Sequence, residues 1–437
     1  MKHSYQSQGL RLLASFLLMF GWSPVHAASC QELRDLGDDL VIALPLSAYA
    51  LTAGYKDANG AGMYTKTLVY TGLATGFFKE VGGKERPDAG TSQQSFVSGH
   101  VSSTMSAASF IYTRYGKGWG IPAYTLAGVT AYSRACAQKH FDDDILGGTM
   151  VALMSNWYAT TPYPGQSRIY PSFSAENDIM LTWAYTVDGN RRPRDPAGFR
   201  ARYKFTFEFG PLSQETNLVQ SPNGTGTLLD FAALEKNTAP TARLLYEYFP
   251  KSYPTQDWSV YYSPLGITDF GNPTQPFDFA GETFDPADNP NFNSNYRWFD
   301  WRFRWRSAFY QSQKWTLRAG AGLQYTFTQV DVEQGTKGAV IKQAEVKVSG
   351  VGPVIHGSAE YHLTPKWSFE GQLDGMEAFW NSRGEYYWNG GLFVKYAATQ
   401  LWEFGFGGRW IAGKTNDPAL YNKFESTDFT FILARSF

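Results

Sequence analysis

Ten residues in the first third of the chain have the types and the order needed to act on a phosphate group. They form three groups, which are Lys79 with Arg86 and Pro87, then Ser98, Gly99 and His100, then Ser133, Arg134, His140 and Asp144. Ammonium and guanidinium groups bind phosphate oxygens through charge-assisted hydrogen bonds, and the arginine fork matches two oxygens at once. The sequence therefore predicts that Lys79, Arg86 and Arg134 converge on one phosphate.

His140 and Asp144 have the spacing of a nucleophile and the group that orients it. Four residues apart, they would share one face of a helix, so that the carboxylate holds the imidazole in one tautomer. The apolar residues Val101, Met105, Ala108 and Tyr112 have helical spacing and predict a helix that starts near Gly99, directly after Ser98. The backbone N–H groups of Ser98 and Gly99 would then lie at the positive end of that helix, where anions bind.

Together the three groups resemble the motifs of the type-2 phosphatidic acid phosphatase superfamily, written K-x6-R-P, P-S-G-H and S-R-x5-H-x3-D. The resemblance covers residues 30–165, and one position departs from it, since Val97 stands where the family has proline. That proline stiffens a loop and does not contact substrate. The change therefore affects loop stiffness and leaves the expected chemistry intact.

The resemblance implies a role for each matched residue. His140 would attack phosphorus to form a phosphohistidine, Asp144 would orient it, and His100 would protonate the leaving oxygen and then activate water. The phosphate-binding residues would be Lys79, Arg86, Ser98, Gly99 and Arg134. No metal or other cofactor is implied, because cations and a helix N-terminus stabilise the transferring group.

The apolar spacing of residues 28–165 is helical and predicts an α-helical bundle. Residues 40–55 and 145–157 are compact apolar segments too short to span a bilayer, so we expect buried helices of a soluble bundle. Residues 1–27 have the basic start, apolar centre and small-residue end of a signal peptide. Cleavage would leave Cys30 and Cys136 in an oxidising compartment, where they could pair, although two cysteines alone do not establish a disulfide.

After a proline- and arginine-rich linker at residues 166–200, the period changes to two. In residues 315–328 every odd position is apolar or aromatic and every even position is Thr, Arg, Gly or Gln. The strands are long, the apolar side is rich in Trp, Tyr and Phe, and the other side has charges such as Arg302 and Arg304. The last strand alternates and ends on Phe437. Residues 201–437 are therefore predicted to form an antiparallel outer-membrane β-barrel of eight strands, with ten or twelve also possible, its charges paired in the lumen.

Two further features of the barrel half have structural interpretations. The apolar parity changes between Val346 and Ile355, which predicts a bulge near residues 350–353. His356 and His362 lie six apart on one strand face, and we expect them in the lumen or a loop, with a metal pair as the alternative.

The two halves predict a metal-independent phosphatase anchored in the outer membrane, with its catalytic domain in the periplasm. Its substrates would be membrane lipid phosphates or small phosphomonoesters, and outer-membrane lipid would surround the barrel. The net charge of −1 gives no reason to expect nucleic acid as a partner. Three alternatives remain, which are a broad-specificity periplasmic acid phosphatase with the barrel as anchor, a vanadate-dependent haloperoxidase, and a lipid-binding or transport barrel with an inactive enzyme domain.

Overall fold

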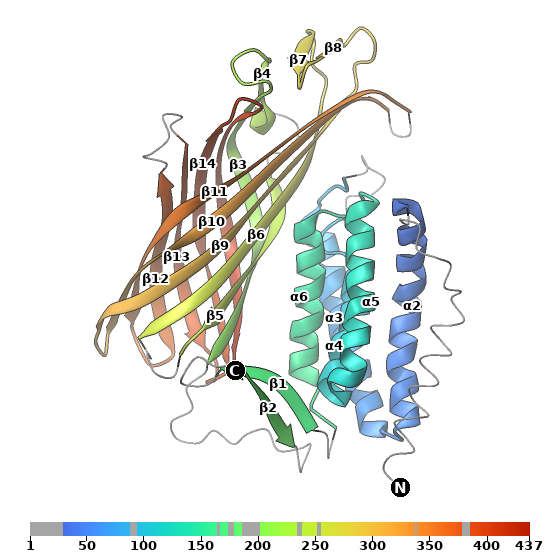
Figure 1. Cartoon of the computed structure of the whole chain (residues 1–437), viewed down its shortest axis with the longest axis vertical. Helices are drawn as coiled ribbons and strands as arrows, with labels where there is room; N and C mark the ends of the chain where they lie inside the picture. The colour runs from blue at the N-terminus through green and yellow to red at the C-terminus, as the bar shows by residue number, and fades with distance from the viewer. Residues whose placement is uncertain are drawn as a thin grey trace.

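The computed structural model describes residues 29–87, 94–163, 167–173, 179–185, 202–233, 238–250, 255–336, 339–377 and 385–437. The expected signal peptide lies outside these residues. Two parts are built around separate cores, a bundle of α-helices and a β-barrel, and they lie side by side (Figure 1).

Five helices form the bundle, which are α2 (Cys30–Gly54), α3 (Ala58–Gly82), α4 (Gly99–Tyr115), α5 (Lys117–Cys136) and α6 (Asp142–Ala159). α4 begins at Gly99, as predicted, and packs against all four others. Tyr64 of α3 and Phe110 of α4 are fully buried in the core they share with α2 and α5. The prediction of buried helices is wrong for the outward faces, because Ile42 and Leu46 of α2 are more than 60% exposed.

Cys30 and Cys136 form a disulfide, a pairing that the sequence left open. It joins the first residue of α2 to the last residue of α5 across 106 positions of the chain. The end of the bundle where α4 and α6 begin is thereby tied together covalently.

Ten long strands close into an antiparallel barrel among the described residues, because β15 also pairs with β3. The favoured number of eight was wrong, and ten lies within the expected range. The strands are β3 (Tyr203–Gln220), β5 (Thr238–Tyr248), β6 (Gln256–Gly271), β9 (Phe292–Gln311), β10 (Trp315–Thr336), β11 (Ala339–His362), β12 (Trp367–Glu377), β13 (Tyr386–Ala397), β14 (Trp402–Asn416) and β15 (Tyr421–Ser436). Short elements at one end are β4 (Leu228–Asp230), η1 (Phe231–Ala233), β7 (Phe277–Phe279) and β8 (Glu282–Phe284).

Within the expected linker, β1 (Ser167–Phe173) pairs with β2 (Ile179–Tyr185).

The alternation predicted for β10 is confirmed, since Leu323 and Tyr325 are exposed whereas Gln324 and Thr328 are buried in the lumen. The bulge predicted near residues 350–353 is wrong, because β11 pairs with β10 in unbroken register there. Apolar residues change side for another reason: the lumen is apolar at the level of Val346 and polar further along the strand. A change in the lumen lining therefore imitates a change in register.

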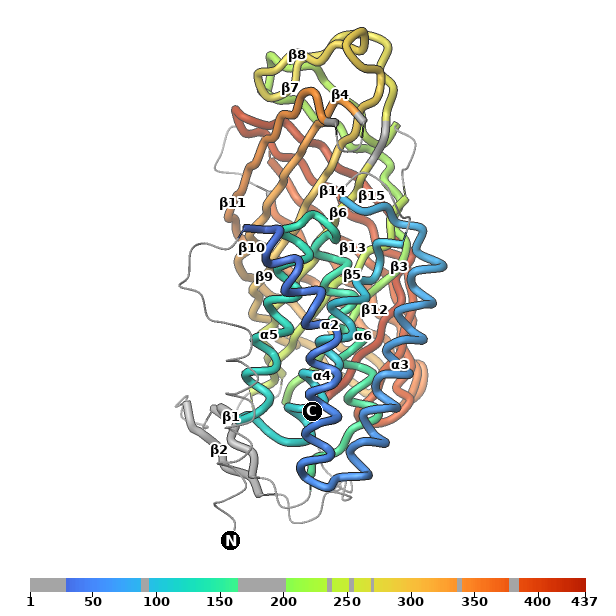
Figure 2. The backbone as a smooth tube through the Cα atoms, turned by 90° about the vertical axis from the view of Figure 1, so that its right-hand side faces the viewer, coloured from blue at the N-terminus to red at the C-terminus, as the bar shows by residue number. Residues whose placement is uncertain are grey.

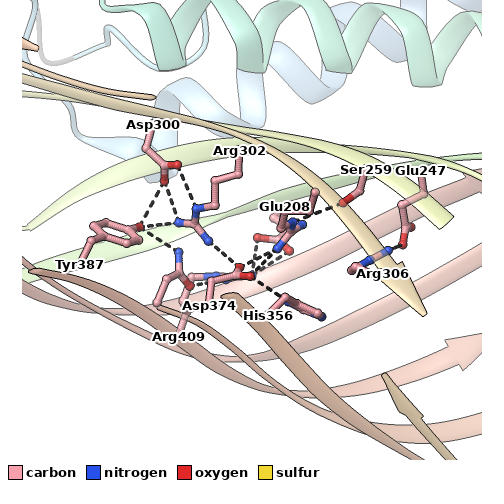
Figure 3. A network of polar contacts seen from close by, with 12 residues as sticks. Glu208, Glu247, Ser259, Asp300, Arg302, Arg306, His356, Asp374, Tyr387 and Arg409 are labelled. Atoms are coloured by element: carbon pink, nitrogen blue, oxygen red, sulfur yellow. Dashed lines mark hydrogen bonds and ion pairs between the residues drawn. The ribbon is translucent and has the colours of Figure 1, made fainter. Parts of the chain in front are cut away.

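The lumen charges pair with one another, as predicted (Figure 3). Five buried arginines each have a carboxylate partner, in the pairs Arg243 with Asp428, Arg302 with Asp300 and Asp374, Arg304 with Asp374, Arg306 with Asp257 and Glu247, and Arg409 with Glu208. His356 Nδ1 lies 2.8 Å from Asp374, within this network. Together with the apolar cluster above it, this network occupies much of the described lumen, where a cavity of about 220 Å³ lined by Trp298, Met376 and Phe424 remains.

α6 packs along the outer surface of the barrel (Figures 1 and 2), and Phe78 of α3 also contacts the barrel at Phe209. Near the start of α6, the Phe141 ring occupies the space above Gly266 of β6, where a Cβ would approach it to 2.2 Å. Near the end of α6, the Trp157 ring packs against Phe205 and Phe437. The helix thus contacts the barrel wall along its whole length.

Candidate active site

The predicted site residues gather at one end of the bundle, where α3 and α5 end and α4 and α6 begin. Lys79 lies in the last turn of α3, Ser98 is the N-cap of α4, and Arg134 lies in the last turn of α5. His140 follows α5, and Asp144 lies in the first turn of α6. Helix ends from four different helices therefore meet here.

His140 is not on a helix with Asp144, which corrects the sequence prediction. It lies two residues before α6, and Asp144 accepts a hydrogen bond from the Phe141 N–H at 3.0 Å while capping that helix. The two side chains still meet, with His140 Nδ1 3.6 Å from Asp144 Oδ2. Ser95 Oγ donates to the same oxygen at 2.5 Å and lies 3.4 Å from His140 Nδ1. A helix cap, not a shared helical face, brings the pair together.

A buried lysine supports the Asp144 carboxylate. Lys84 Nζ lies 2.7 Å from Asp143 and 3.0 Å from Asp144, and all three side chains are buried. Although burial alone would lower it, these two carboxylates raise the pKa of Lys84 above its usual value. Burial favours the neutral form of Asp144, but Lys84 and His140 outweigh it and hold the pKa of this carboxyl well below its usual range. These surroundings therefore favour the ionised form of Asp144.

The surroundings of His140 favour its neutral form. Burial lowers its pKa below the usual value, and nearby Arg86 and Lys79 act in the same direction, against the opposing effect of Asp144. A neutral imidazole whose Nδ1 faces a carboxylate presents its other nitrogen, Nε2, as a nucleophile.

Lys79, Arg86 and Ser98 retain capacity for an anion. Among the described residues, neither Lys79 nor Arg86 has a carboxylate within ion-pair distance, and Lys79 Nζ instead donates to the Gln94 carbonyl at 2.7 Å. Arg86 Nε and Ser98 Oγ are buried with no hydrogen-bond partner. Gly99 lies beside this group, since a Cβ there would be 3.6 Å from Lys79 Cε. The arrangement has positive charge and donors in excess of its internal acceptors.

Arg134 and His100 meet at a carboxylate that the sequence analysis missed. Arg134 Nη1 and His100 Nε2 lie 2.8 Å and 2.9 Å from the same oxygen of Asp38 in α2. Arg134 also donates to the Arg34 carbonyl and to Ser133 Oγ. Burial and then Arg134 lower the pKa of His100, whereas Asp38 raises it. Arg134 is thus fully engaged here, unlike Lys79 and Arg86.

Close packing positions the loop before α4. A Cβ on Gly148 of α6 would lie 2.6 Å from the Ser98 carbonyl, and one on Gly147 would lie 2.6 Å from Val97 Cγ1. Val97, in place of the family's proline, is fully buried and packs in the cluster that joins the bundle to the barrel. The Gly147-Gly148 pair in a helix and the charged neighbours Lys84 and Asp143 were the available sequence signals for these supporting residues.

The fold and the site together define a class of protein. In this class, a helical bundle with a site suited to phosphate is joined to a closed β-barrel. Residues 62–167 match the model of the PAP2 superfamily. A lipid A 4'-phosphatase of Helicobacter pylori is 30% identical over 183 residues, covering 38% of this chain and 91% of that protein. A lipid A 1-phosphatase of Porphyromonas gingivalis is 27% identical over 163 residues, covering 33% of this chain and 36% of that protein. The chain belongs to the PAP2 superfamily.

Solved structures similar to the barrel part include the outer membrane protease OmpT of Escherichia coli, at 10% identity and a TM-score of 0.38, covering 54% of this chain and 97% of that one. Ail of Yersinia pestis is 7% identical with a TM-score of 0.21, covering 53% and 99%. The barrel is defined by the pairing of its own strands, which β15 closes against β3.

Proposed function

We propose that the protein is a metal-independent phosphatase that hydrolyses phosphate monoesters of membrane lipids through a phosphohistidine. The observation that carries the proposal is the buried His140, whose Nδ1 faces the Asp144 carboxylate beside Lys79 and Arg86, two cations with no carboxylate partner among the described residues. An incoming phosphate would supply the negative charge that Lys79 and Arg86 lack. Relatives that are named as lipid A phosphatases support a lipid phosphate as the substrate.

Two displacements at phosphorus complete the proposed reaction. In the first, His140 Nε2 forms a bond to phosphorus while the ester oxygen leaves with a proton from His100. In the second, His100 takes a proton from water, whose oxygen displaces His140 and releases phosphate. His100 must turn from Asp38 toward the leaving oxygen, and its partial exposure leaves room for that movement.

We also propose that the barrel spans the outer membrane, because aromatic and aliphatic side chains cover its outer surface and paired charges lie in its lumen. A buried charge network across the lumen favours an anchor over a transport channel. A periplasmic position of the helical domain, expected from the sequence, remains a prediction, and the packing of the bundle on the barrel wall favours another position.

Phosphate release from the refolded full chain tests the proposed activity. Phosphatidic acid, a lipid A phosphate and p-nitrophenyl phosphate would be compared in EDTA, with and without vanadate. We expect EDTA-resistant release that vanadate inhibits, with the lipids preferred. His140→Ala should abolish it, whereas His362→Ala, at the end of a barrel strand, should not.

No release from any substrate by a chain with a folded barrel would refute the phosphatase and direct attention to haloperoxidase or lipid binding. Equal turnover of p-nitrophenyl phosphate and lipids would instead support a broad-specificity enzyme with the barrel as anchor only.

A further inference from the structure

The outward surface of the bundle is apolar at the height where the bundle packs against the barrel. Ile42, Leu46, Leu73, Phe77 and Ile121 are between 57% and 69% exposed. Among the described helices, α2 is also long and apolar enough to cross a membrane, by length and composition. Contiguous exposed apolar surface of this kind marks contact with a membrane or a partner.

Apart from Lys66 in α3, the charged residues of the described helices lie at the two ends of the bundle. Uncharged runs of 12 to 16 residues occupy all five described helices, at residues 40–54, 67–78, 101–113, 118–133 and 145–159. At 1.5 Å per residue these runs are about 18 to 24 Å long, close to the roughly 25 Å apolar band of an outer-membrane barrel. Lys66 shortens the run in α3, and a lysine at that depth extends its ammonium toward the nearer interface.

The bundle covers a part of the barrel wall that would otherwise face lipid. Phe207 and Phe209 of β3 alternate with Glu208, which points into the lumen, so both rings point outward. They belong to one apolar cluster with Met150 and Met154 of α6. Because the outward residues at this height face lipid elsewhere on the barrel, the free faces of the bundle meet the same lipid.

The catalytic end of the bundle lies where the outer surface of the barrel changes from aromatic to charged. Outward positions change from Phe299 to Arg297 along β9, and from Phe327 to Asp331 along β10. Arg297 lies over the ring of Phe141, next to His140, at 5.4 Å from its centroid. The site is therefore level with the edge of the apolar band, where lipid headgroups lie.

This is also the end of the barrel with the longer loops. The connections there include residues 221–237 and 272–291, whereas those at residues 312–314, 363–366 and 398–401, at the other end, have three or four residues. Outer-membrane barrels have short periplasmic turns and longer loops on the outside.

We propose that the helical bundle is embedded in the bilayer beside the barrel, with its apolar face against acyl chains and its catalytic end at the headgroups of the outward leaflet. This proposal depends on one part of the proposed function, namely that the barrel spans the outer membrane. The site would then reach phosphates of lipids in that leaflet by lateral diffusion, and the lipid would not leave the membrane.

Labelling of single cysteines with a membrane-impermeant maleimide tests this position in cells. The native chain has no free thiol, since both of its cysteines are in the disulfide. Leu73→Cys reports the middle of the apolar face, Val81→Cys the catalytic end and Lys117→Cys the opposite end. Leu228→Cys, exposed on the long-loop end of the barrel, is the positive control.

We expect Val81→Cys and Leu228→Cys to react in intact cells, Lys117→Cys only after the outer membrane is permeabilised, and Leu73→Cys only after denaturation. Reaction of Leu73→Cys in permeabilised cells would overturn the embedding. Protection of Val81→Cys until permeabilisation would overturn the orientation and return the site to the periplasm. Because labelling does not depend on turnover, an inactive protein with the expected pattern would refute the phosphatase and leave this inference standing.

Discussion

The catalytic end of the bundle and the lumen of the barrel are both buried clusters of Arg, His and Asp, yet their charge balance differs. In the lumen, each of the five arginines has a carboxylate partner, so that Arg302, for example, pairs with both Asp300 and Asp374. At the catalytic end, Lys79 and Arg86 lack such a partner among the described residues, and Ser98 Oγ has no hydrogen bond.

The difference shows how similar residues serve two purposes. A buried charge is costly unless an opposite charge accompanies it, so a network with its own partners is structural. A cluster with an excess of one sign is stabilised by a ligand of the other sign, and here that ligand would be phosphate. The histidines follow the same division: His356 pairs with Asp374 inside the network, whereas His140 Nε2 is directed to substrate in the proposed reaction.

The largest expected effect separates the two regions by activity. His140→Ala should lower kcat by about 10⁴-fold, or about 5 kcal/mol in the barrier, because no other group replaces the nucleophile. His356→Ala should leave the kcat of the folded fraction within a few-fold of the native value. Single-turnover phosphate release measures both variants, and a similar loss in both would contradict the distinction.

A change in the lumen network should lower the stability of the barrel and leave the activity unchanged. Asp374→Asn leaves Arg302 and Arg304 with less opposing charge and should cost about 3 to 5 kcal/mol of barrel stability, with the chemical step unchanged. Thermal unfolding of the barrel in detergent provides the measurement. An unchanged melting temperature would mean that the lumen network does not stabilise the fold.

Lys84 combines features of the two regions. It is buried and paired with carboxylates, like the lumen arginines, and it lies next to the catalytic site. Lys84→Met should cost about 3 to 5 kcal/mol because Asp143 and Asp144 are left without their cation. The double variant with Asp143→Asn should recover part of that stability. If the two changes prove additive, the buried pair is not coupled as its geometry implies.

Gly148→Ala tests whether close packing positions the phosphate-binding loop. The added Cβ would meet the Ser98 backbone carbonyl at 2.6 Å, so α4 must move away from α6. We expect a loss of about 10-fold in kcat/KM and about 1 to 3 kcal/mol in stability. Gly128→Ala, where a Cβ meets nothing, is the matched control and should change neither.

The smallest expected effect concerns pH. The Asp38 carboxylate raises the pKa of His100, so Asp38→Asn should lower that pKa further. The first proposed step needs protonated His100, and the alkaline limb of kcat/KM should therefore move to lower pH. A shift to higher pH, or no shift, would exclude His100 as the acid that Asp38 tunes.

Much of the organisation followed from the sequence because it depends on local periodicity. Alternation in residues 315–328 placed each β10 side chain on the correct face, and helical spacing placed the start of α4 at Gly99. Motif order identified the side chains that meet at the end of the bundle. The strand and helix assignments rest on periods of 2 and 3.6, which the sequence displays directly.

Tertiary structure decided the rest, because it depends on residues that are distant in the chain. The number of strands was set by where β15 meets β3, and the apparent bulge near residue 350 came from a change in the lumen lining. Lys84 and Asp38 were not singled out, since nothing in their local pattern distinguishes a buried ion pair from a surface charge. The packing of α6 on the barrel wall has no periodic signature in the sequence. It arises because an apolar surface of α6 and an apolar surface of the barrel wall bury one another.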